Sequence, residues 1–462
     1  MIVDPTGNAI VSGNFQGDLT MGNASLTNGG LFLIKCNRTG NVLWSRKDGD
    51  RRSNGTAVGL DSQNNIYVLC DLQGTGGASV SLAGTNVSAL VALAKYDAQG
   101  QGLWARPVIT SAYVMAPLSM AVDGDGNSVW SVFFWGAITI GETNLSADAT
   151  SGALVKCDPD GRVLWVRAAL TPNWCTLDSP AFDSSGNIYV CGNFGTAVSF
   201  GTTNLSSLGP RDAFLAKYTG DGDLLWVKQW GGDGPDGSNR LAVDSAGNCF
   251  VQGRFFQTAM IGSVMLSNNL PTNFFCLIKY DPAGGVAWAR QLCQSSVETL
   301  ISVDASGNCY FAVNGCDATN TLYGKYDPEG NLAWSKLTSQ FFVHSLRADS
   351  LGHCYIFGQF WYTTTGATFD DYVLTTTNTS FDVVLAKLGT TTAPQLTVQL
   401  ANDSVTLLWP VLAEDYYLES TSDLRSFNTW TSNGIPPVGN GLFKSVTADK
   451  STPQKFYRLV RP

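Results

Sequence analysis

The sequence predicts an all-β fold built from seven copies of one four-stranded unit, followed by a small β-sandwich. Three observations support this prediction. A turn motif of the form Asp-x-x-Gly-Asn recurs at a spacing of roughly 60 residues, with one shorter interval. A second motif, which ends in tryptophan, recurs in six of the units. Gly, Asn, Thr and Ser are plentiful and only 14% of the 462 residues are charged, a composition that favours turns and strands over helices.

The first motif predicts a tight hairpin turn between the first two strands of each unit. Asp and Asn side chains bond to nearby backbone amides, and Gly supplies a positive φ. The motif lies at residues 4–8, 61–65, 123–127, 183–187, 244–248, 304–308 and 349–353. The copy at 123–127 resembles the start of a Ca²⁺ loop, but the downstream glutamate of an EF-hand is missing, so a turn is the better interpretation.

The second motif predicts the turn between the third and fourth strands, as in Lys-Tyr-Asp-Pro-Glu-Gly-Asn-Leu-Ala-Trp at residues 325–334. In the fourth unit the four strands are expected at residues 179–183, 187–194, 213–218 and 224–229. Side chains along 187–194 alternate between two faces, as they do in a strand. Four-stranded sheets repeated around an axis leave only short edges, which is the architecture of a β-propeller.

The last two units are expected to be irregular. The sixth has a much shorter connection between its second and third strands, which predicts a lower upper face with a notch beside Asp317. The seventh ends at Lys387 without its tryptophan and supplies three strands. Its edge is expected to stay open or to be covered by residues 390–400, since an open edge leaves backbone groups unpaired. Because Met1 begins inside a repeat, we expect the missing strand and a leader peptide upstream.

The domain boundaries follow from the repeats. We expect a seven-bladed β-propeller with an incomplete last blade over residues 1–389, a linker over 390–394, and a small β-sandwich over 395–462. The last segment has short alternating strands of its own and resembles a fibronectin type III module. It carries no recognisable chemistry.

The repeat also resembles a known family. The pattern Asp-x-x-Gly-Asn-x-Tyr-Val-x-Gly-x-Phe, followed by Phe-Leu-Ala-Lys-Tyr and Gly-x-Leu-Leu-Trp, is best matched by residues 183–232. It is similar to the SBBP repeat of seven-bladed propellers in bacterial secreted and surface proteins, and the resemblance covers residues 2–389. It also resembles the tryptophan-docking motif of quinoprotein propellers. That second resemblance implies a structural role, buried between strands or blades, for Trp44, Trp104, Trp165, Trp226, Trp288 and Trp334.

Candidate ligand contacts come from two sets of equivalent positions on the side of the longer loops, where scaffolds usually carry function. The first set consists of the residue directly after the glycine of each second strand. The residue after that one, such as Phe15 or Phe194, is expected to pack in the core. The second set consists of the residue five positions before each turn aspartate, together with its neighbours, where the first strand is expected to line a central channel. Together they give Asp178, Asn193, Asn239, Arg240, Arg254, Glu298, His344 and Gln359. Solvated edge residues and a water-filled channel are the alternative interpretation.

Several functions are disfavoured. The net charge of −9 argues against a broad nucleic-acid surface. No apolar run is long enough to span a membrane. Two histidines and the absence of a Cys-x-x-Cys pair argue against zinc, and no metal or cofactor site is predicted. The eleven cysteines are expected to be small buried residues, since equivalent positions in neighbouring blades are too far apart for disulfides. A monomer is expected.

The sequence therefore favours a non-catalytic, extracytoplasmic binding or scaffold protein, secreted or at the cell surface, with a glycan or protein ligand on the long-loop face. The alternative is a carbohydrate-active enzyme, a lyase or glycosidase, with acids in the channel mouth. Two carboxylates about 5–10 Å apart across a sugar-sized cleft would favour the enzyme. A sialidase-like enzyme would also need converging arginines, and Arg211, Arg240 and Arg254 lie in neighbouring units.

Overall fold

The computed structural model describes the chain except at the following positions: residues 22–23, 38–40, 111–112, 269, 296, 298, 317–319, 349–353, 362–366, 370–371, 375–380, 389–396, 401–403, 411–416, 422–430, 433–437, 440–442, 450–455 and 461–462. Of the strand residues 20–21, 113–118, 357 and 359, and of all residues from 361 onward, only the backbone pairing is described. Within these limits every element is a β-strand except one 3₁₀ turn, η1 (Gln73–Thr75).

The first three units form antiparallel sheets in the predicted order. Unit one pairs β1 (Ile2–Val3), β2 (Ala9–Phe15), β5 (Gly30–Cys36) and β6 (Val42–Asp48). Unit two pairs β7 (Asn54–Leu60), β8 (Ile66–Asp71), β11 (Val91–Tyr96) and β12 (Gly102–Ile109). Unit three pairs β13 (Tyr113–Val122), β14 (Ser128–Ile140), β15 (Thr143–Cys157) and β16 (Val163–Ala169). A single pairing of Ile109 with Ile140 joins units two and three into one eight-stranded sheet.

The next four units repeat the pattern until the last strand. Unit four pairs β17 (Asp178–Phe182), β18 (Ile188–Phe194), β21 (Asp212–Tyr218) and β22 (Leu224–Trp230). Unit five pairs β23 (Gly237–Val243), β24 (Cys249–Phe256), β27 (Asn273–Tyr280) and β28 (Val286–Gln294). Unit six pairs β29 (Thr299–Val303), β30 (Cys309–Cys316), β31 (Asn320–Tyr326) and β32 (Leu332–Ser339). Unit seven pairs β33 (Phe341–Ala348), β34 (Cys354–Trp361) and β37 (Phe381–Leu388).

Short hairpins extend most of the connections between second and third strands. They are β3 (Leu19–Met21) with β4 (Ala24–Leu26), β9 (Val80–Leu82) with β10 (Thr85–Val87), β19 (Ala197–Phe200) with β20 (Thr203–Ser206), β25 (Thr258–Ile261) with β26 (Val264–Ser267), and β35 (Ala367–Phe369) with β36 (Tyr372–Leu374). In unit six β30 ends at Cys316 and β31 begins at Asn320, so this unit has the short connection that the sequence predicts. Asp317 and its predicted notch lie outside the described residues.

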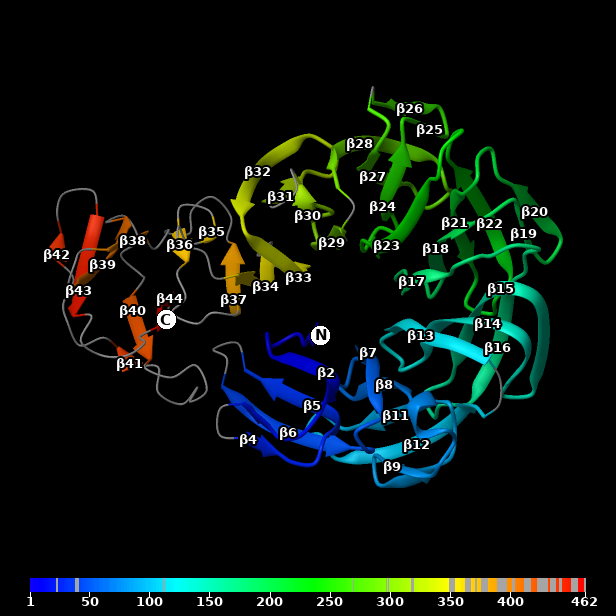
Figure 1. Ribbon diagram of the computed structural model, residues 1–462, viewed down its shortest axis with the longest axis horizontal. Helices are drawn as coiled ribbons and strands as arrows, with labels where there is room; N and C mark the ends of the chain where they lie inside the picture. The colour runs from blue at the N-terminus through cyan, green and yellow to red at the C-terminus, as the bar shows by residue number, and fades with distance from the viewer. Residues whose placement is uncertain are drawn as a thin grey trace.

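Successive sheets follow one another around a common centre, with their first strands innermost (Figure 1). The inner strand of each unit contacts that of the next, from β7 through β13, β17, β23 and β29 to β33. The apolar core lies between sheets: one cluster joins Leu33 of β5 to Val68 of β8, and another joins Tyr189 of β18 to Val251 of β24. Phe15 and Phe194, expected to pack, are buried. The chain is therefore a β-propeller repeat protein.

The motif tryptophans lie between neighbouring sheets, as expected. Four of them donate a hydrogen bond through Nε1 to a backbone oxygen of the next sheet: Trp44 to Ala98 (3.2 Å), Trp165 to Gly220 (3.1 Å), Trp226 to Pro282 (3.3 Å) and Trp288 to Pro328 (3.1 Å). The motif glycine is required here, because a Cβ on Gly222 would lie 2.9 Å from the Trp165 ring and its φ is +84°. Of the six, Trp288 is buried and the other five are half-buried, since they lie on the outermost strands.

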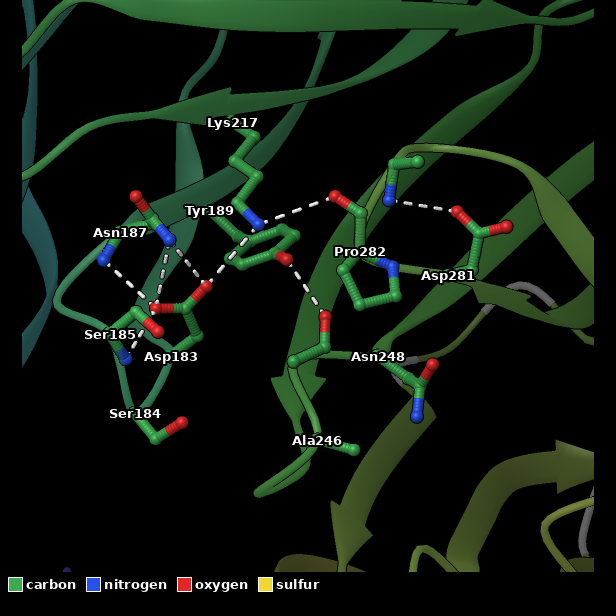
Figure 2. A network of polar contacts seen from close by, with 12 residues as sticks. Asp183, Ser184, Ser185, Asn187, Tyr189, Lys217, Ala246, Asn248, Asp281 and Pro282 are labelled. Atoms are coloured by element: carbon green, nitrogen blue, oxygen red, sulfur yellow. Dashed lines mark hydrogen bonds and ion pairs between the residues drawn. The ribbon is translucent and has the colours of Figure 1, made fainter.

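The aspartate of the first motif and the lysine that opens the second motif form another connection between sheets, which Figure 2 shows for Asp183 and Lys217. The Asp183 carboxylate accepts hydrogen bonds from the Ser185 and Asn187 amides, both at 2.9 Å, which explains the Asp-x-x-Gly-Asn spacing. The Lys217 ammonium lies 3.3 Å from that carboxylate, over the Tyr189 ring, and donates to the Pro282 oxygen of the next sheet. The turn at 123–127 closes in the same way around Asp123, which supports a turn rather than a Ca²⁺ loop.

Unit seven has three strands in the described part of the chain, as the sequence predicts. Beyond it, β38 (Thr397–Leu400), β39 (Ser404–Pro410), β43 (Phe443–Asp449) and β42 (Val438–Gly439) form one sheet, and β41 (Thr431–Ser432), β40 (Tyr417–Thr421) and β44 (Phe456–Val460) form another. Residues 397–400 pair with β39, and among the described strands β37 pairs only with β34. Residues 389–396, which include the predicted linker, lie outside the described part of the chain.

One expectation about cysteines is wrong. Cys293 of β28 and Cys316 of β30 form a disulfide between units five and six, with Cα atoms 5.9 Å apart. The two residues do not occupy equivalent repeat positions, so the spacing argument did not cover them. The other nine cysteines are not disulfide-bonded. All are buried except Cys36, which is half-buried, and burial raises the pKa of its thiol to about 11.

Candidate functional site

The candidate positions on the first strands coincide with β-bulges. The pairing of an inner strand with its neighbour skips one residue at Thr56 in β7, Leu118 in β13, Asn239 in β23 and His344 in β33. In β17 the register shifts between Asp178 and Ala181. A bulge leaves its extra residue unpaired and turns its side chain away from the regular alternation. β29 has no register shift, and its Thr299 is buried.

These bulges present polar side chains from strands that surround the centre of the ring (Figure 1). Asn239 and His344 are exposed, and Asp178 and Arg240 are half-buried. Burial raises the pKa of the Asp178 carboxyl to about 6, against the opposing effects of a hydrogen bond with Thr176 and the charge of Arg240. Burial lowers the pKa of Arg347 on β33, and the charge of Arg240 lowers it further.

Asn193 has a different role from the one predicted. It is 7% exposed, and its amide links units four and five. Its Oδ1 accepts from the Ser238 amide at 2.6 Å, and its Nδ2 donates to Thr176 at 3.0 Å and to Asn239 at 3.1 Å. With these bonds in place, Asn193 positions Asn239 and is itself withdrawn from solvent.

Arg254 lies at the end of β24, opposite Gly237 in the register and beside the connection between β22 and β23. A second arginine, Arg211, lies directly before β21 and approaches Gly237. Its Nε lies 3.9 Å from the position that a Cβ on Gly237 would occupy, and it donates to the Asp236 backbone oxygen at 2.8 Å. Its Cζ lies 5.9 Å from the centre of the Trp174 ring. Burial lowers the pKa of both guanidinium groups, and Arg254 lowers that of Arg211 further.

Two buried carboxylates support this loop. Asp236 accepts hydrogen bonds from the Gly232 amide at 2.7 Å and the Phe256 amide at 3.0 Å. Asp212 accepts from Gln229 at 2.6 Å and from the Leu208 amide at 3.1 Å. Both carboxyls are fully buried, so they hold the connections in shape and do not face a substrate.

The predicted site residues are thus brought together in part. Asp178, Asn193, Asn239 and Arg240 meet where β17 and β23 adjoin, with Arg254 beside them. His344 lies on β33, two sheets further around the ring. Glu298 and the side chain of Gln359 lie outside the described residues. The sequence offered Arg211 only as one of three arginines that a sialidase-like enzyme would need. It gave no signal for Trp174 or Asp236, because their positions depend on how the loops 170–177 and 231–236 fold.

The buried Asp236 gives a pH-dependent prediction. Burial is the main cause that raises its pKa to about 7, from an ordinary value near 3.8. The folded state therefore keeps a proton that the unfolded chain releases, so this stabilisation is complete below pH 4 and lost as pH rises through 7. The loss is at most about 1.4 kcal/mol per pH unit. Between pH 5 and pH 7, the free energy of unfolding in urea should fall more for the wild type than for Asp236→Asn, which cannot titrate. An equal change in both proteins would contradict this prediction.

Two hollows on the described surface lie elsewhere. One is lined by Lys228, Gln229 and Tyr280, and the other by Asp148, Leu170 and Thr171. Neither contains two acids. No group of three or more His, Cys, Asp or Glu residues able to hold a metal ion occurs in the described part of the chain. Over the same residues, no helix has the length and apolar character needed to cross a membrane.

Comparison with known proteins gives a distant likeness. No family model matches the chain. An uncharacterized WD repeat-containing protein of Acanthamoeba polyphaga mimivirus is 27% identical over 240 residues, which cover 42% of this chain and 17% of the relative's own length. The chain therefore corresponds to a small part of that protein.

Solved structures with a similar course of the chain include a protein of unknown function from Bacteroides caccae (TM-score 0.36, 11% identity, 71% of this chain and 93% of that one). Others are a puromycin hydrolase (TM-score 0.41, 13% identity, 82% of this chain and 55% of that one) and the Dos1 propeller (TM-score 0.35, 9% identity, 77% of this chain and 81% of that one). At these scores the likeness supports no argument about function, and the description of this chain as a β-propeller repeat protein rests on its own sheets and their repeated turns.

Proposed function

We propose that the chain is a non-catalytic binding or scaffold protein, a seven-bladed β-propeller that holds a glycan or protein ligand on its long-loop face. The observation that carries this proposal is the set of bulges on the inner strands. Asp178, Asn239, Arg240 and His344 lie at or beside these shifts in register, on inner strands of three different sheets. Polar side chains that converge in a concavity are the usual pattern of a ligand site.

The finer architecture belongs to the same proposal. Seven units with the same strand order, six of which have the same turn in the described part of the chain, support seven blades, the last one with three strands. The two small sheets after residue 396 support a compact β-sandwich module like fibronectin type III, with a role in attachment or spacing. We propose that the protein acts as a monomer and that it has no membrane span.

An extracytoplasmic location, secreted or at the cell surface, is supported by the disulfide between Cys293 and Cys316, since disulfides persist in oxidising compartments. The repeat's resemblance to SBBP propellers points the same way.

The alternative, a lyase or glycosidase, is supported by Asp178, whose raised pKa of about 6 suits a general acid. It requires a second carboxylate across the channel mouth. Asp212 and Asp236 do not supply it, because both are buried and bonded to backbone or side-chain amides. Glu298, the other acid expected there, lies outside the described residues.

Arrays of glycans and of surface proteins, with mass spectrometry of the bound ligands, test the proposal. We expect the chain to bind a defined ligand set without altering it. Asn239→Ala and His344→Ala should weaken that binding, whereas Ser185→Ala, on the turns at the opposite end of the sheet, should not. Absence of binding, or cleavage of a bound glycan, would overturn the proposal; cleavage would favour the enzyme.

A further inference from the structure

Two arginines at the junction of units four and five converge without an anionic partner. Arg211 lies directly before β21 and Arg254 lies near the end of β24, and both residues are half-buried. Burial lowers the pKa of Arg211, and the charge of Arg254 lowers it further. Two like charges repel each other, and an anion bound between them would relieve that repulsion.

Internal contacts account for little of their donor capacity. Arg211 uses Nε for the Asp236 backbone oxygen, and no hydrogen bond of its two terminal nitrogens is recorded among the described residues. Neither arginine has a described carboxylate within 4.0 Å. Burial lowers the pKa of both arginines and the charge of Asp236 opposes this in both, but the two oxygens of Asp236 are occupied by the Gly232 and Phe256 amides.

The surroundings hold the pair in place. The Trp174 ring lies under the Arg211 guanidinium, and the loop that carries Asp236 is fixed by its hydrogen bonds. Gly237, opposite Arg254, has no side chain, and a Cβ there would meet Asn193 Oδ1 and Arg211 Nε. The exposed amide of Asn239 lies two residues further along β23.

From this geometry we propose that Arg211 and Arg254 form a subsite for the carboxylate of an acidic sugar. A guanidinium pair matches a carboxylate through forked N–H donors, and a fixed arginine loses little entropy on binding. The flanking indole and amide are the groups that contact a pyranose ring and its hydroxyls. This inference rests on the proposed function and narrows it to glycans that carry a carboxylate.

Isothermal titration of the full chain with trigalacturonate, its methyl ester and 3′-sialyllactose tests this subsite. We expect an acidic sugar to bind and the neutral ester to bind at least about tenfold more weakly, the loss from one charge-assisted contact. Arg211→Gln and Arg254→Gln should each weaken binding of the acid by a similar factor without affecting binding of the ester. Arg254→Lys should fall in between, because it keeps the charge and loses the fork. The two acids distinguish a uronate from a sialic acid.

Arg162→Gln is the matched control, since this exposed arginine lies in a turn at the other end of unit three; it should leave the affinity unchanged. Thermal unfolding of each variant separates loss of the subsite from loss of fold. Equal affinity for acid and ester, unchanged affinity in both glutamine variants, or no binding of either acid would overturn the subsite. If the arrays still show ligands whose binding depends on Asn239, the proposed function stands while this inference falls.

Discussion

Replacing Trp288 by alanine is expected to destabilise the protein by about 3–5 kcal/mol, the usual cost of removing a large buried ring. Trp288 is 5% exposed and lies between units five and six. Its ring centre is 5.9 Å from those of Phe250 and Tyr326, and its Nε1 bonds to the Pro328 oxygen. Urea-induced unfolding, followed by fluorescence and circular dichroism, measures the change.

Trp135→Ala provides the control for this prediction. Trp135 is 53% exposed on the extension of β14, outside the junctions between sheets. We expect it to cost less than about 1 kcal/mol, as most exposed substitutions do. Similar losses for Trp135 and Trp288 would mean that the tryptophans of the repeat do not hold the sheets together.

Lys217→Met should cost about 3–5 kcal/mol, because it leaves the buried Asp183 carboxylate without its cation. The two side chains are 7% and 5% exposed and 3.3 Å apart, and the lysine also bonds to the next sheet at Pro282. A double-mutant cycle with Asp183→Asn separates the ion pair from the turn's other bonds. The coupling free energy from urea unfolding should be a substantial part of the single-variant loss.

The exposed pair of Arg162 and Asp160 is the matched comparison. These side chains are 66% and 62% exposed and 3.0 Å apart. Solvent screens such a pair, so its coupling should lie between about 0 and 1 kcal/mol. Equal coupling free energies in the two cycles would contradict a structural role for the repeat lysine.

The losses of stability expected for Trp288→Ala and Lys217→Met concern features that could be predicted from the sequence, because each feature recurs in most of the repeats. The aspartate turn and the tryptophan recur at fixed positions, and the six described turns and four of the tryptophans repeat the hydrogen bonds found around Asp183 and Trp165. The short sixth connection and the three-stranded seventh unit were equally visible as departures from the repeat.

The site was predictable only in part. Counting back from each turn identified Asn239 and His344, but the bulges that expose them depend on how two strands pair, which one strand's sequence does not reveal. Counting likewise placed Asn193 among ligand contacts, whereas its hydrogen bonds to Thr176 and Ser238 make it a link between sheets.

Features that break the repeat escaped prediction altogether. The disulfide joins Cys293 and Cys316, which occupy different positions in units five and six. The approach of Arg211 to Arg254 depends on the fold of residues 231–236, a segment rich in glycine whose conformation is set by the buried Asp236. Such contacts arise from tertiary packing and leave no periodic signal.

The most direct test of ligand binding on the long-loop face is hydrogen–deuterium exchange with and without the best ligand from the arrays. We expect slower exchange in the segments 170–178, 207–212 and 231–240 when the ligand is bound, and no change in the turns at 123–127, 183–187 and 244–248. Protection confined to those turns, or spread evenly over both ends of the sheets, would contradict the account.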